Sequence, residues 1–185
     1  MPTVVIRPDG DISVGNFTNT PVNAVLSDSD DATFTNNTTT NQAFTVSLDD
    51  VSLSGATFNS FVLTTRAKKS GKGNAEWNAQ LQTSGGSALC DDDFTSTSTS
   101  YADFNSSSTS FSGGFSESDV NGLKVRIETI NNRQCFFAEV FVTIDYTAAA
   151  SGPANLTSYN GIAKASITSI NGITIANVTS INGVS

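Results

Sequence analysis

Alternation of apolar and polar side chains along short runs is the feature that most constrains the fold of this chain. Between Ala75 and Leu81 every second residue is apolar, and Glu76, Asn78 and Gln80 fall between them. Successive side chains of a β-strand point to opposite faces, so this period of two predicts strands with one buried face. The other strand signals lie at residues 44–48, 58–69, 88–90, 100–111, 123–127 and 135–146. About eight strands with turns roughly every 8–12 residues and no convincing helix predict an all-β fold, a two-sheet antiparallel jelly-roll sandwich.

The connections between these strands carry turn signals. We expect Asp9-Gly10 to form a turn between two short apolar runs, and residues 69–74 to close a hairpin. Residues 84–87 predict a further turn, and residues 117–122 are expected to hold one helical turn. The segments interpreted as loops are residues 16–20, 27–31, 36–42 and 112–119.

The charge of the chain excludes several classes of function. The net charge is −8, whereas nucleic-acid binding needs a basic surface, so no nucleic-acid partner is expected. The only basic run, residues 66–72, is interpreted as a strand end with solvated lysines rather than a phosphate site. No apolar stretch is long enough to span a membrane, and Arg7 interrupts the apolar N-terminus before a signal-peptide core forms. We therefore expect assembly in a host cytoplasm without membrane insertion.

Few residues offer catalytic or metal-binding chemistry. The chain has no histidine, which removes Ser–His and Cys–His nucleophile pairs and leaves Cys90 and Cys135 too few for a closed zinc site. We interpret these cysteines as reduced, half-buried thiols on separate strands, with a disulfide as the alternative. Acidic residues form three loop clusters, interpreted as solvated turns with a structural calcium ion as the alternative. The clusters are Asp28/Asp30/Asp31, Asp49/Asp50 and Asp91/Asp92/Asp93. We predict that the chain is not an enzyme and has no catalytic, cofactor-binding or metal site.

An eleven-residue repeat ends the chain. The pentapeptide TSYNG at residues 157–161 returns as TSING at residues 168–172 and 179–183. The apolar residues recur about every 3.6 positions, as in a helix, but the Asn-Gly pair in every unit breaks a helix and marks a tight turn. Each unit is therefore predicted to be a short strand, an Asn-Gly turn and another short strand. Its Thr, Ser, Asn, Gly and aliphatic side chains suit packing and not catalysis.

Three regions follow from these patterns. Residues 1–147 are predicted to form the sandwich, residues 148–153 a linker of small residues, and residues 154–185 an assembly tail. Three short units cannot bury a core alone, so the tail needs the sandwich, symmetry mates or another protein. Its predicted assembly residues are Tyr159, Ile162, Ile167, Ile170, Ile173, Val178, Ile181 and Val184.

Several segments of the sandwich share a further similarity. They are residues 62–71 (VLTTRAKKSG), 77–81 (WNAQL), 123–127 (LKVRI) and 136–140 (FFAEV), with residues 15–18 and 27–31 near the start. Together they resemble a family of small bacteriophage virion proteins with a jelly-roll β-sandwich, over most of residues 1–147. The Ser-Ile-Asn-Gly units resemble the tails of phage structural proteins. The resemblance implies a virion component without enzymatic activity, and it carries over no functional residue.

The expected function is that of a structural protein of a tailed bacteriophage virion, attached or oligomerised through its tail. Capsid decoration is the preferred location, with a tail or fibre component next. The expected partners are other virion proteins and further copies of the chain, with a trimer among the options, and a host-surface glycan is a further candidate. One alternative is a carbohydrate-binding adhesion module, which would need exposed aromatic side chains. Another is an extracellular filament subunit whose tail completes a neighbour's sheet.

Overall fold

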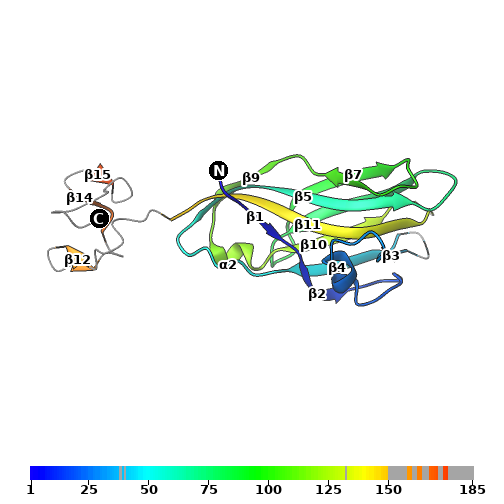
Figure 1. Ribbon diagram of the computed structural model, residues 1–185, viewed down its shortest axis with the longest axis horizontal. Helices are drawn as coiled ribbons and strands as arrows, with labels where there is room; N and C mark the ends of the chain where they lie inside the picture. Colours follow the sequence, from blue (N-terminus) through cyan, green and yellow to red (C-terminus); the bar gives the residue numbers. More distant parts are fainter. Residues whose placement is uncertain are drawn as a thin grey trace. The chain divides into compact units, whose positions relative to one another are not determined.

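In a computed structural model the chain forms two compact units, Met1–Thr147 and Ala148–Ser185 (Figure 1). The structure describes residues 1–37, 39, 41–131, 133–149, 158–159, 162–163, 167–170 and 173–174. No helix within these described ranges has the length and apolar character needed to cross a membrane.

The first unit is a sandwich of two antiparallel sheets (Figure 1). Sheet A has the order β1 (Thr3–Ile6), β11 (Cys135–Thr147), β5 (Thr57–Lys69) and β8 (Ala102–Asn105). In the same sheet β3 (Thr35–Asn36) also pairs with β11, and β9 (Thr109–Phe115) also pairs with β5. Sheet B has the order β2 (Pro8–Ser13), β4 (Ala43–Leu48), β10 (Lys124–Thr129), β6 (Ala75–Gln82) and β7 (Ala88–Ser96).

The strands pair in a nested order. The first strand, β1, pairs with the last, β11; moving inward, β4 pairs with β10, β5 with β8 and β9, and β6 with β7. Successive pairs alternate between sheet A and sheet B, as when one long antiparallel hairpin is rolled into two layers. This is the connectivity of a jelly roll. The predicted all-β jelly-roll sandwich is confirmed.

Alternating side chains fill the space between the sheets. Along β6 every second residue is buried, and β4 and β10 show the same alternation, as their sequences predict. Trp77 is fully buried, with ring centroids 4.8 Å from Phe104, 5.5 Å from Phe137 and 5.8 Å from Phe94. Burial of such a side chain stabilises the fold by roughly 1.5–3 kcal/mol, so this aromatic cluster is a principal reason that the two sheets stay together.

The turn predicted at Asp9-Gly10 is wrong. Both residues lie inside β2, where the register with β4 shifts between Pro8 and Gly10, and the chain passes from sheet A to sheet B before Pro8. A Cβ atom at Gly10 would lie only 2.8 Å from the Ser47 hydroxyl oxygen. The glycine therefore permits a close approach of two strands at a β-bulge and does not form a turn.

The hairpin predicted at residues 69–74 is also wrong. β5 belongs to sheet A and β6 to sheet B, so this segment crosses from one layer to the other. A hairpin is excluded because β11 occupies one edge of β5, and β8 and β9 occupy the other. The predicted turn at residues 84–87 is confirmed as the β6–β7 hairpin, in which the Gly86 amide donates to the Thr83 carbonyl at 2.9 Å.

Two short helices lie in the connections. α2 (Glu117–Val120) is the predicted helical turn, and Ser116 and Asp119 form a reciprocal capping box at its start. α1 (Val22–Leu26) was not predicted. The Asp11 carboxylate, on β2, accepts hydrogen bonds from the amides of Val22 and Asn23 at 2.9 and 2.7 Å. These amides belong to the first turn of α1, where no residue of the helix can accept from them. Such a cap leaves no local sequence signal.

The second unit contains two pairs of two-residue strands. β12 (Ser158–Tyr159) pairs with β13 (Ile162–Ala163), and β14 (Ser169–Ile170) pairs with β15 (Ile173–Thr174). Two residues, Asn-Gly in the sequence, separate the strands of each pair. The strand pairs of the first two repeat units therefore agree with the predicted non-helical pattern. The third unit, and residues 150–153 of the predicted linker, lie outside the described residues.

Candidate functional site

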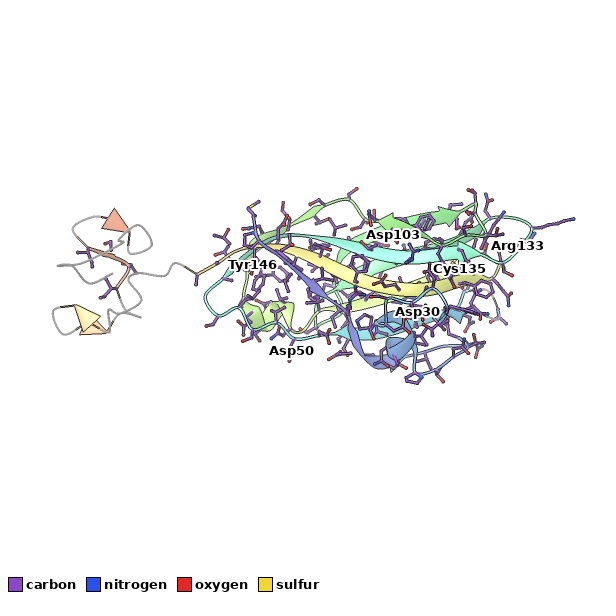
Figure 2. All side chains as sticks on the ribbon, viewed as in Figure 1. Asp30, Asp50, Asp103, Arg133, Cys135 and Tyr146 are labelled. Carbon is purple, nitrogen blue, oxygen red and sulfur yellow. The ribbon has the colours of Figure 1, made fainter. Side chains whose placement is uncertain are left out.

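The two ends of the sandwich differ in chemistry. β5 and β11 run antiparallel, with Lys69 opposite Cys135 at one end and Thr57 opposite Thr147 at the other. Thirteen-residue strands at about 3.3 Å per residue extend roughly 40 Å, so these ends are far apart. The tail begins after Thr147. Arg133 and Cys135 lie at the opposite end from Tyr146 (Figure 2), and we call that opposite end the tip.

A pocket of about 280 Å³ opens at the tip. Its walls come from the β5–β6 connection and the β10–β11 connection, and every lining residue is polar or glycine. The lining residues are Lys69, Ser70, Lys72, Gly73, Arg133 and Gln134. We call this site the tip pocket.

The three cations of the tip pocket are unpaired. Among the residues that the structure describes, none of Lys69, Lys72 and Arg133 has a carboxylate within ion-pair distance. The other described cations have partners: Arg7, Arg66 and Arg126 pair with carboxylates, Lys68 lies over aromatic rings, and Lys124 donates to the Ser84 carbonyl. Three described cations without a carboxylate partner therefore line one pocket of a chain whose net charge is −8.

Hydrogen bonds hold the two walls of the pocket together. Ser70 donates through its amide to the Gln134 carbonyl at 3.2 Å and through its hydroxyl to Gln134 Oε1 at 3.1 Å. Behind them Asn37, only 1% exposed, accepts from the Cys135 amide at 2.8 Å and donates to the Arg133 carbonyl at 3.3 Å. The buried Asn37 side chain therefore holds the backbone of Arg133 and Gln134 in place through two hydrogen bonds.

Gly73 makes room for the Arg133 guanidinium. A Cβ atom at this position would lie 2.8 Å from Arg133 Nε, closer than van der Waals contact allows. Its φ of +86° also lies in the left-handed region that favours glycine. The glycine thus permits both the backbone turn and the position of the cation.

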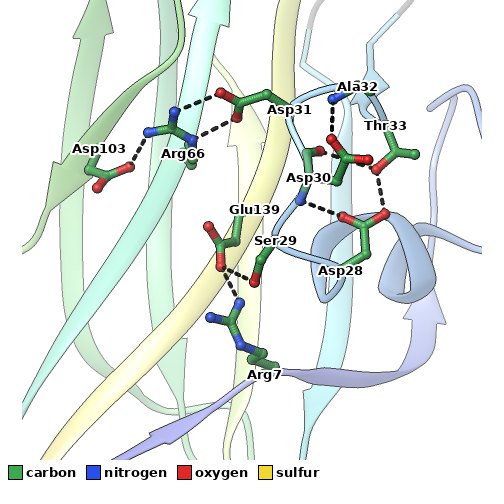
Figure 3. Close-up of polar contacts among 10 residues, drawn as sticks. All are labelled: Arg7, Asp28, Ser29, Asp30, Asp31, Ala32, Thr33, Arg66, Asp103 and Glu139. Atoms are coloured by element: carbon green, nitrogen blue, oxygen red, sulfur yellow. Dashed lines mark hydrogen bonds and ion pairs between the residues drawn. The ribbon is translucent and has the colours of Figure 1, made fainter.

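In the acidic loop at residues 28–33, the carboxylates of Asp28 and Asp30 accept hydrogen bonds from the loop itself (Figure 3). Asp28 accepts from the Asp30 amide at 3.0 Å and from the Thr33 hydroxyl, and Asp30 accepts from the Ala32 amide at 2.8 Å. Such Asx turns are a common use of aspartate in loops. Across the described residues no group of three or more acidic or thiol side chains is placed to hold a metal ion. Asp28 and Asp30 therefore act as hydrogen-bond acceptors for the turns of their own loop.

Two arginines fasten this loop to the outer face of sheet A (Figure 3). Arg66 binds both carboxylate oxygens of Asp31 at 2.7 Å and one oxygen of Asp103 at 2.9 Å. The hydrogen bond from Arg66 lowers the pKa of Asp31 below its usual value. Arg7 pairs with Glu139, which also accepts from the Ser29 hydroxyl. The loop is therefore a structural part of the sheet A surface.

Lys68 departs from the predicted solvated state. Its ammonium nitrogen lies 4.1 Å from the ring centroid of Tyr101, 5.7 Å from that of Phe136 and 6.0 Å from that of Phe34. This arrangement is a cation–π contact that covers half-buried aromatic surface. The interpretation of the basic run as uniformly solvated is wrong at this residue.

Neither cysteine is half-buried as predicted. Cys90 lies on β7 in sheet B and Cys135 on β11 in sheet A; both are buried free thiols, 9% and 0% exposed. Burial raises the pKa of each thiol, which disfavours the reactive thiolate.

No described aromatic side chain is exposed. Every Phe is buried or half-buried, Trp77 is fully buried, and Tyr101 and Tyr146 are half-buried. The stacking surface that an aromatic sugar platform requires is absent from the described part of the chain.

The structure brings four of the predicted assembly residues into register in pairs. Tyr159 lies opposite Ile162, and Ile170 lies opposite Ile173. Ile167 and Ile170 are half-buried, and Val178, Ile181 and Val184 lie outside the described residues.

Comparisons with known proteins do not assign this chain to a family. No protein-family model matches the chain, and no curated protein matches it. Three solved structures are similar to parts of it. An arabinose-bound GH51 α-L-arabinofuranosidase is 12% identical at a TM-score of 0.41, over 60% of this chain and 19% of that one. A truncated AlyQ with CBM32 and alginate lyase domains is 12% identical at 0.40, over 84% and 37%. An isomalto-dextranase of Arthrobacter globiformis T6 complexed with panose is 8% identical at 0.31, over 65% and 17%. The chain spans less than half of each of these proteins.

Proposed function

We propose that this chain is a non-enzymatic structural protein of a tailed bacteriophage virion, and that its second unit attaches it to the particle or to further copies. A capsid decoration protein is the preferred form, with a tail or fibre component next. The virion assignment rests on the sequence resemblance over residues 1–147 and on the repeat tail.

The observation that carries the assembly role is the division of the chain into a jelly roll and a separate repeat unit. The sandwich has its own core of aromatic and aliphatic side chains. Pairs of two-residue strands bury too little surface to be stable alone, so the repeat is expected to gain its stability from a partner surface.

Truncation after Pro153 tests the proposal. We expect the truncated chain to keep the circular dichroism spectrum and thermal transition of the sandwich, and to be lost from purified particles that the full chain enters. Normal incorporation of the truncated chain would overturn the assembly role. Imaging of the particles adds a second readout, because icosahedral or ring symmetry supports a virion component and a helical lattice selects the filament alternative.

A pair of point variants separates the tail from general surface effects. Ile170→Asp places a charge in the repeat, where the side chain is half-buried. Ile130→Asp makes the same change at a sandwich residue that is already 43% exposed. We expect only the first variant to reduce incorporation, and equal effects of both would argue against a role of the repeat.

A further inference from the structure

We infer that the tip pocket binds the oxyanion group of a ligand about the size of one sugar ring, such as the carboxylate of a sugar acid or a sugar-borne sulfate or phosphate. The inference concerns the sandwich alone and does not rest on the proposed virion role.

Charge is the first argument. Lys69, Lys72 and Arg133 converge on one concavity, and no described carboxylate neutralises them. Elsewhere among the described residues the arginines pair with acidic side chains, Lys68 contacts aromatic rings and Lys124 donates to a backbone carbonyl. The chain as a whole has a net charge of −8, and the clustered cations of the tip pocket attract anions locally.

The size and polarity of the tip pocket limit the kinds of ligand that it can bind. A volume of about 280 Å³ equals roughly nine water molecules at ~30 Å³ each, which suits a single sugar ring better than a bare ion. The described residues that line the pocket are polar or glycine, which disfavours apolar ligands. The Arg133 fork can bind a carboxylate or phosphate through two parallel hydrogen bonds, and the lysines act as point charges.

The pocket is built before a ligand arrives. The buried Asn37 side chain fixes the backbone on both sides of Gln134, and Ser70 is tied to Gln134 by two hydrogen bonds. Gly73 leaves the space that the guanidinium of Arg133 occupies. A site whose donors are already positioned loses less freedom on binding, which favours affinity.

Nuclear magnetic resonance titration of the ¹⁵N-labelled full chain at low ionic strength tests the inference. The probes are galacturonate, glucose 6-phosphate, neutral galactose and inorganic phosphate. We expect the first two to shift the amide signals of Ser70, Gly73 and the Gln134 side chain with saturable curves, and galactose to leave them unchanged. Added salt should weaken binding, because the attraction is electrostatic.

Matched variants locate the site. Arg133→Gln should weaken binding of the responding sugar anion at least about tenfold, the factor expected from the loss of a charge-assisted hydrogen bond worth ~1.4 kcal/mol. Lys124→Gln removes one positive charge outside the pocket and should change binding less than about twofold. Gly73→Ala keeps all charges but displaces Arg133, and should weaken binding in the same direction as Arg133→Gln.

Three results would overturn the inference. The first is no saturable shift with either sugar anion. The second is binding of inorganic phosphate alone, which would mark the pocket as a place for an adventitious ion only. The third is an equal loss in Arg133→Gln and Lys124→Gln, which would reduce the effect to net charge. A response to galacturonate only, or to glucose 6-phosphate only, supports the site and identifies which oxyanion it takes.

Discussion

At the scale of single residues, long-range polar contacts decide which charges are available for binding. Arg66 is held by Asp31 and Asp103, whereas Arg133 lines a pocket together with Lys69 and Lys72. The basic run that includes Lys69 and Lys72 was visible in the sequence. Its completion by Arg133 and Gln134 was not, because their approach depends on strand pairing across more than sixty positions of the chain. The sequence alone therefore favoured solvated lysines over an anion site, because half of the pocket lining comes from a segment distant in the chain.

The Arg66–Asp31 pair predicts a pH-dependent contribution to stability. In a double-mutant cycle with Arg66→Met and Asp31→Asn, we expect a coupling of about 0.5–1 kcal/mol at neutral pH, because both side chains are partly exposed. The pKa of Asp31 is lowered in the folded state from 3.8, so the coupling is fully present above that value and is lost as the pH falls through the lowered pKa. Urea unfolding followed by fluorescence of the single tryptophan, Trp77, measures it. A coupling that persists unchanged in strong acid would contradict the prediction.

At the scale of elements, period-two alternation predicted the strands well and their partners poorly. β4, β6 and β10 follow from side-chain pattern alone, since one face of each is buried. The connection at residues 69–74 carries the same glycine-rich signal as a hairpin, but it joins different sheets, because the edges of β5 are filled by strands distant in sequence. α1 was missed because its cap comes from Asp11 on β2. Local chemistry thus predicts the type of an element, and tertiary pairing selects its neighbour.

The β6–β7 hairpin offers a test of turn geometry with an adjacent control. Gly86 has φ +86° and open space around its Cα, so Gly86→Ala should destabilise the sandwich by about 1–2 kcal/mol through backbone strain alone. Gly85 is not in the left-handed region, and Gly85→Ala should be within about 0.5 kcal/mol of the wild type. Equilibrium urea unfolding of both variants measures the difference. Equal effects would show that the turn adapts to a side chain.

Acidic side chains on the edge strand β7 are expected to prevent this strand from pairing with another molecule. Asp91 and Asp93 are exposed on this strand, and both accept hydrogen bonds from the Asn78 side chain on β6. Charged residues on an exposed edge discourage pairing with another chain. We expect Asp91→Asn/Asp93→Asn to self-associate severalfold more than Asp49→Asn/Asp50→Asn, which makes the same charge change at exposed residues outside any strand. Sedimentation velocity of the full chain compares the two, and equal association would refute a specific role of the edge.

At the scale of the whole molecule, nested pairing makes most contacts of the sandwich distant in sequence. Thr3 lies opposite Asp145, so the outermost pair cannot form until both ends of the sandwich have been synthesised. Closing such long loops is slow, and folds dominated by non-local pairing commonly fold in milliseconds to seconds. The jelly-roll class was predictable from strand number and spacing, whereas the order of the strands in each sheet was not.

This topology predicts slow refolding, with β1 pairing late. We expect the full chain to refold with a time constant between tens of milliseconds and seconds, followed by Trp77 fluorescence after dilution from urea. Val4→Asp, in the strand that closes the sheet, should accelerate unfolding more than it slows refolding, because the outermost pair is expected to form last. Refolding within microseconds, or an effect of Val4→Asp confined to the refolding rate, would contradict this order.

The backbone amide of Tyr146 donates to the carbonyl of Pro2 at 3.1 Å, so the first and last strands of the sandwich start and finish side by side. The two ends of the jelly roll are therefore close enough to be joined, which makes the sandwich a candidate for circular permutation. A short Gly/Ser bridge from Thr147 to Met1, with a new opening at Gly71, would preserve every strand pair of the sandwich and move both of its termini to the tip. A protein fused to either terminus of such a permuted chain would be attached next to the tip pocket and not at the opposite end of the sandwich.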